Sequence, residues 1–79
     1  MALPLEEARE MYEECLRQYL EAIRIAFPVG RSVFVRRGAR WIGPYRVLGH
    51  SQIEPRVRLK NLQTAKQRWT HERSIQLAD

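Results

Sequence analysis

The chain has 79 residues and a formal net charge of +5, and 44% of its residues are hydrophobic. This length allows a single domain with a thin core, and this composition excludes a wholly disordered chain. No apolar run approaches the roughly 20 residues that a bilayer-spanning helix needs, and no secretory signal is visible. We therefore expect no membrane association, and we expect the cytoplasm, or the nucleus of a eukaryotic host, as the compartment.

Residues 1–28 predict an amphipathic helix. Pro4, Glu6 and Glu7 favour a helix start, and Pro28 with Gly30 ends the helix. Apolar side chains recur at spacings of three and four along one face, which comprises Ala8, Met11, Tyr12, Cys15, Leu16, Tyr19, Leu20, Ile23, Ala26 and Phe27. The only cysteine of the chain belongs to this stripe and is expected to be a buried thiol.

The predicted helix is too long for the rest of the chain to cover it. Its residues 4–27 span roughly 36 Å, whereas a compact domain of the remaining residues is roughly 20–25 Å across. We therefore expect part of the stripe to pair with a second copy in a homodimer, or to lie against a partner protein. The alternative is a helix that lies diagonally across its own domain. The residues that we assign to oligomerisation are Tyr12, Leu16, Tyr19, Leu20 and Ile23.

Residues 29–79 show the period of two that is typical of strands. Alternation and turn signals predict strands over residues 32–36, 41–48 with a bend at Gly43-Pro44, 56–60, 67–70 and 75–77. Five short strands joined by tight turns indicate a small antiparallel barrel. The predicted fold is thus α+β, with one helix followed by a five-stranded antiparallel barrel in a single compact domain.

Three segments resemble known small barrels of the SH3-like type. The run VGRSVFVRR of residues 29–37 resembles the opening strand of such barrels, and WIGPYRVL of residues 41–48 is similar to the second strand of the C-terminal domain of retroviral and retrotransposon integrases. WTHERSI of residues 69–75 is similar to the end of that domain, where a histidine and a serine lie in a turn before the last strand. The resemblance implies an SH3-like fold and a binding role, which is DNA binding and oligomerisation in integrases and peptide binding in Tudor and chromo relatives. It implies no integrase activity, because only a helix precedes these segments.

The charges of the chain are segregated. Residues 1–28 carry three arginines and six glutamates, which gives 3 − 6 = −3, whereas residues 29–79 carry eleven Arg or Lys and three acids, which gives 11 − 3 = +8. A positive field over the second segment favours a polyanionic or acidic partner. The nucleic-acid-binding residues that we assign, expected to gather on one surface, are Arg36, Arg37, Arg40, Trp41, Arg46, Arg56, Arg58, Lys60, Lys66 and Arg68.

The two tryptophans, Trp41 and Trp69, lie among these cations, as a platform for stacked bases requires. We assign Trp41, beside a turn, to the surface and Trp69 to the core.

No motif predicts catalysis, a metal or a cofactor. His50 and His71 lack further ligands at metal-binding spacing, and a small barrel offers no deep pocket to orient them against Ser51 or Ser74. His71 is expected to cap the turn before the last strand.

Three functions remain open. The first is a dimeric, non-catalytic accessory or regulatory protein that binds DNA or RNA. The second is an interaction module, of the kind found in phages and mobile elements, that docks on an acidic protein surface. The third is a structural subunit of a larger complex.

Overall fold

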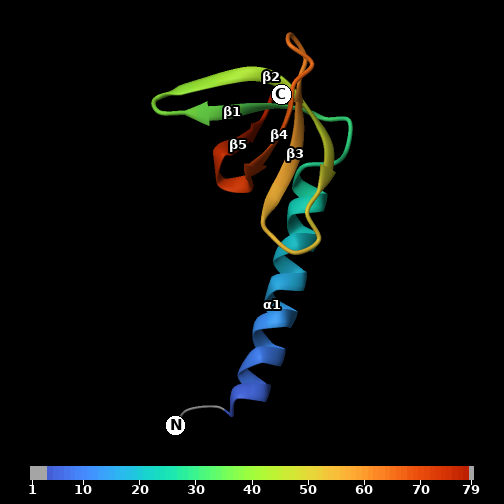
Figure 1. Ribbon diagram of the computed structural model, residues 1–79, viewed down its shortest axis with the longest axis vertical. Helices are drawn as coiled ribbons and strands as arrows, with labels where there is room; N and C mark the ends of the chain where they lie inside the picture. Colours follow the sequence, from blue (N-terminus) through green and yellow to red (C-terminus); the bar gives the residue numbers. More distant parts are fainter. Residues whose placement is uncertain (1–3, 79) are drawn as a thin grey trace.

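The computed structural model describes residues 4–78 as one helix followed by a five-stranded antiparallel sheet (Figure 1). The helix α1 spans Leu5–Ala26, and the strands are β1 (Ser32–Arg37), β2 (Arg40–His50), β3 (Arg56–Asn61), β4 (Gln67–His71) and β5 (Ile75–Leu77). A short 3-10 helix, η1 (Glu72–Ser74), joins β4 to β5. The predicted α+β class, the helix and all five strands are confirmed.

The helix begins and ends where the sequence predicts. Pro4 is its N-cap, Glu6 and Glu7 occupy the first turn beside the positive end of the helix dipole, and Arg24 lies in the last turn. After the helix, His50 ties its end to the sheet, since His50 Nε2 lies 2.6 Å from the Phe27 carbonyl oxygen and donates to it. This bond satisfies one of the carbonyls that every helix leaves unpaired at its C-terminus.

The strands pair in the order β4-β3-β2-β1-β5, so β4 and β5 are the two edges of an open sheet. The sheet is therefore not closed into the barrel that the sequence predicts. Strand β2 runs unbroken for 11 residues through the predicted bend, where the Gly43-Pro44 peptide is cis. Gly43 has φ +153°, and a Cβ there would lie 3.0 Å from the Phe34 ring and 3.1 Å from the Val33 carbonyl. Only glycine fits this close approach of the two strands.

One face of the sheet and one end of the helix share a core. The sheet contributes Val33, Val35, Tyr45, Val47, Val57, Leu59 and Ile75. The helix contributes Leu20 and Ile23, with Leu16 and Phe27 packed against them. Leu16, Leu20 and Ile23 lie in the second half of α1, and Phe27 directly follows its last residue. The first half projects away from the sheet, which gives the molecule extents of 51 × 25 × 22 Å (Figure 1).

Candidate nucleic-acid interface

Strand alternation places one group of cations and a tryptophan together on the outer face of β2, β3 and β4. Val57 and Leu59 of β3 point into the core, so Arg56, Arg58 and Lys60 point away from it. The register sets Trp69 of β4 directly opposite Arg58. Residues opposite each other in an antiparallel pair have Cβ atoms about 5 Å apart, and their diagonal neighbours are within reach of long side chains.

The neighbouring strand extends this group. Arg46 of β2 pairs with Lys60 of β3 and so lies on the same outer face. We call Arg46, Arg56, Arg58, Lys60 and Trp69 the outer patch. Trp69 is 48% exposed within it. Arginine and lysine around an exposed indole supply phosphate donors beside a stacking surface.

Few acids neutralise the outer patch. Within residues 4–78, Arg56 is the one member with a carboxylate partner, at 3.1 Å from Glu54, and both side chains of that pair are more than half exposed. Arg58 donates from Nη2 to the amide oxygen of Gln67, two residues before Trp69 on the same strand. This bond orients the guanidinium on the patch without reducing its charge.

A second group of cations lines an open hollow of about 530 Å³ on the other side of the sheet. Its positive residues are Arg37, Lys66 and Arg68, which surround Ile42 and Tyr45, and its lining contains no carboxylate. Since successive residues of a strand alternate in direction, Arg68 reaches this hollow while Trp69 faces the outer patch. The two groups therefore meet at the edge strand β4.

The three remaining predicted residues lie at the end of the β1–β2 hairpin. Trp41 is 45% exposed and pairs with Arg36 across the hairpin, and Arg36 Nε donates to the Gly38 carbonyl at 3.0 Å. Arg40 follows the turn and is exposed. The surface position of Trp41 is confirmed.

Two sequence-based expectations about this region are wrong. The cations do not gather on one surface, because strand alternation divides them between the two faces of the sheet. Trp69 is not a core residue. Its neighbour Thr70 pairs with the buried Val57 and takes the inward position, which leaves Trp69 outside. The sequence shows that Val57 and Leu59 point inward. Together with the register of the β3–β4 hairpin, this alternation would have placed Trp69 on the outer face, but the register cannot be read from the sequence.

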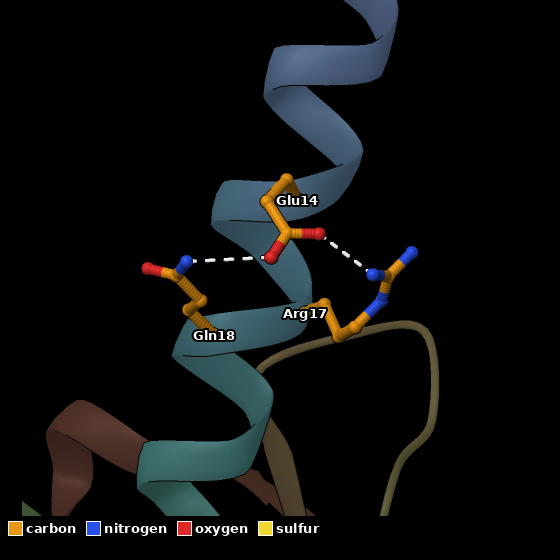
Figure 2. A network of polar contacts seen from close by, with 3 residues as sticks. All are labelled: Glu14, Arg17 and Gln18. Atoms are coloured by element: carbon orange, nitrogen blue, oxygen red, sulfur yellow. Dashed lines mark hydrogen bonds and ion pairs between the residues drawn. The ribbon is translucent and has the colours of Figure 1, made fainter.

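Among residues 4–78, the ion pairs that the helix acids form stay on the helix itself. Glu14 accepts hydrogen bonds from Arg17 Nη1 at 2.6 Å and Gln18 Nε2 at 3.4 Å, all on the helix itself (Figure 2). Arg24 and Glu21 form a further pair at 3.4 Å on the same helix. The positive charge of the sheet therefore stays available to a ligand.

The residues assigned to oligomerisation have two different environments. Leu20 and Ile23 are buried in the core of their own chain, at 6% and 4% exposure, and so cannot contact a second copy. Tyr12 and Tyr19 are exposed, and Leu16 is half-buried. Cys15 was predicted to be buried but is exposed. At this position along the helix, the sheet covers a different side of α1.

The polar side chains that could suggest catalysis serve the backbone instead. His71 is the N-cap of η1 and accepts from the Arg73 N–H at 3.2 Å, which confirms its predicted capping role. Ser51 Oγ accepts from the backbone N–H groups of Ile53 and Glu54. Between Pro4 and Ala78, no three His, Cys, Asp or Glu side chains are grouped to hold a metal ion.

Within the same residues, α1 is not apolar enough to cross a membrane. Comparison with protein-family models, with curated proteins and with solved structures found no match. The fold and the surface define the chain as a small α+β protein with a basic, tryptophan-bearing sheet.

Proposed function

We propose that this protein is a non-catalytic nucleic-acid-binding protein that contacts DNA or RNA at the outer patch and around the edge strand β4. The observation that carries the proposal is the half-exposed Trp69 directly opposite Arg58. A base stacks on the indole, and Arg46, Arg56, Arg58 and Lys60 hold the phosphates on either side. Stacking requires an unpaired base, so single-stranded nucleic acid is the ligand that fits.

Binding of this kind depends on salt and little on sequence. Each phosphate that an arginine or lysine neutralises releases condensed counterions, so affinity falls as salt rises. An outer patch with one stacking residue offers few contacts to base edges, which are the contacts that specify sequence. The protein then serves as an accessory or regulatory factor rather than as a reader of a defined site.

The test is fluorescence anisotropy of labelled single-stranded DNA and RNA with the full chain. We expect Trp69→Ala to weaken binding by about 5-fold or more, since stacking contributes about 1–3 kcal/mol per base. Arg58→Glu should lower the slope of log affinity against log salt by about 1 or more. Arg17→Glu, on the polar face of the helix, changes the net charge by the same amount and is the matched control. Equal affinity for Arg58→Glu and Arg17→Glu would contradict the proposal.

The same patch also suits an acidic protein surface. Tryptophan and arginine are the residues most enriched at protein hot spots, and the exposed Trp69 is flanked by arginines. If no nucleic acid binds at low salt, this second candidate takes precedence. Its test is co-sedimentation with an acidic partner protein, comparing Trp69→Ala and Arg58→Glu with the control Arg17→Glu.

A further inference from the structure

The helix α1 carries a second apolar seam that its own sheet does not cover. The first seam, with spacings of four, three and four, consists of Leu16, Leu20, Ile23 and Phe27 and packs on the core. The second seam repeats with spacings of three and four along the whole helix and consists of Leu5, Ala8, Tyr12, Cys15, Tyr19, Ala22 and Ala26. All of its members are exposed except Ala8, which is half-buried, and Leu5 and Tyr12 are 71% and 66% exposed. We call this set the exposed seam.

Such spacing is the signature of helix-on-helix packing. An alternating three-four repeat averages 3.5 residues, the period at which two helices stay in contact as they supercoil. The repeat lasts for the full 22 residues of α1, about three heptads. A lipid or an unstructured peptide requires no such register, whereas another helix does.

The charged residues of the helix avoid this seam. All six glutamates, together with Arg17 and Arg24, lie on the other faces of the helix. The positions directly beside the seam include the apolar residues Met11 and Ile25. Met11 and Ile25 are 54% and 71% exposed. Glu14 accepts hydrogen bonds from Arg17, on the polar side, and from Gln18, which flanks the seam between Met11 and Ile25 (Figure 2). Arg9 is the single charged residue adjacent to the seam, so a partner helix can approach without desolvating carboxylates.

A hollow in the middle of the seam has the shape that a partner side chain fills. It measures about 290 Å³ and is lined by Tyr12, Cys15, Leu16 and Tyr19, with Pro55 at its side. These four helix residues stand at positions i, i+3, i+4 and i+7, the arrangement that forms the hole for a knob in a coiled coil. The Tyr19 hydroxyl donates to the Glu72 carboxylate, which holds that wall of the hollow in place. The same hydrogen bond raises the pKa of the Tyr19 phenol above its ordinary value.

We propose that the exposed seam binds the exposed seam of a second copy of this chain in an antiparallel pair. In this register Tyr12 enters the hollow at Cys15 of the second copy. Tyr19 then faces Ala8, and Leu5 faces Ala22. Every large residue meets a small one, which fills the space between the helices. A parallel pair would instead stack tyrosine against tyrosine and leave gaps where alanine meets alanine.

Charge favours the same orientation. Residues 5–15 carry one arginine and five glutamates (1 − 5 = −4), residues 16–26 carry two arginines and one glutamate (2 − 1 = +1), and the sheet segment 29–79 carries +8. A parallel pair would place like charges side by side at both ends. An antiparallel pair sets the acidic half of one helix beside the basic end of the other copy. It also separates the two sheets by roughly 30 Å, well beyond the Debye length of about 8 Å at physiological salt.

The first test is sedimentation equilibrium of the full chain, and it does not depend on nucleic-acid binding. We expect the wild type to sediment with about twice the 9.4 kDa mass of one chain. Tyr12→Glu and Ala22→Arg should both sediment as monomers, although they change the net charge in opposite directions. Glu10→Gln, on the polar face, is the control and should remain a dimer. Circular dichroism checks that each variant is folded. A wild type that stays monomeric, or a dimer that survives both substitutions, would overturn the proposal.

The second test fixes the orientation. In a Cys15→Ala background, Arg24→Cys carries a nitroxide, and the distance between the two labels is measured by double electron–electron resonance. The antiparallel register offsets the two labels by about 21 residues along the helices, so we expect roughly 30 Å or more. A parallel pair has no such axial offset, so the same labels are separated only across the pair, by about 10 Å between the helix axes plus the reach of two side chains that point away from the seam. The shorter distance would refute the antiparallel arrangement.

Discussion

Thr70 is the single polar residue among the buried side chains of residues 4–78. It pairs with Val57 on the inner face of the sheet, and its Oγ1 has no hydrogen-bond partner among these residues. A buried hydroxyl without a partner lowers the stability of the folded state, because it has lost its hydrogen bonds to water. We expect Thr70→Val to raise the free energy of unfolding by about 1 kcal/mol.

The measurement is urea denaturation followed by far-UV circular dichroism. Thr70→Ser is the matched control, because it keeps the hydroxyl and removes the methyl group, and it should lower stability. A valine variant less stable than the wild type would show that the hydroxyl has a partner in solution.

Position by position, the sequence predicted side-chain roles well only where local pattern decides them. His71 caps η1 and Trp41 is exposed, as expected from the turns that they adjoin. Trp69 and Cys15 were misplaced, because hydrophobicity alone assigned them to the core. Which face a strand residue takes depends on its partner across the sheet, and which side of a helix is covered depends on where the sheet lies. Neither is contained in the local sequence.

Among the elements, α1 performs two separate tasks along its length. Its second half completes the core with Leu20 and Ile23, whereas its first half makes no contribution to that core. We expect Leu20→Ala to lower the free energy of unfolding by about 2–4 kcal/mol, since it removes buried methyl groups and leaves a cavity. Met11→Ala, at a position 54% exposed, should change stability by less than about 0.5 kcal/mol.

Chemical denaturation at a protein concentration low enough to keep the chain monomeric separates these two effects. At that concentration the exposed seam does not contribute to stability. Equal losses for both variants would show that the first half of the helix is packed, contrary to the structure.

The same elements show how far sequence periodicity carries a fold prediction. The helix was expected over residues 4–27 and spans Leu5–Ala26, and each of the five strands lies within a residue or two of its predicted range. Periodicity succeeded because each element has a clear period and strong end signals. It failed on the closure of the sheet and on the division of the cations between two faces, because both follow from strand pairing across the whole chain. The second seam of the helix was present in the sequence, but the predicted stripe merged it with the seam that packs on the core.

At the scale of the whole molecule, the two proposals combine in one arrangement. An antiparallel pair of helices carries one basic sheet at each end, so a dimer presents two outer patches roughly 30 Å apart. A nucleic acid long enough to reach both patches binds them together, and the second contact then forms at a high effective concentration. The acidic first half of each helix lies between the patches and repels the strand that connects them. The two proposals together therefore predict that a spanning strand contacts the dimer at its ends rather than along its middle.

This arrangement makes affinity depend on ligand length. We expect a single strand that spans both patches to bind the wild type on the order of 10²-fold more tightly than a strand that fills one patch. Tyr12→Glu, which separates the two copies, should leave the affinity for the short strand unchanged. It should reduce the ratio of the two affinities to the small gain that a longer strand has because one patch can bind it at several positions. Trp69→Ala should weaken the binding of both strands while the protein remains dimeric. Anisotropy titrations with the two strands, at one salt concentration and with the dimer confirmed by sedimentation, provide the comparison. A length dependence that persists in the Tyr12→Glu monomer would mean that one sheet holds the entire strand, around the β4 edge.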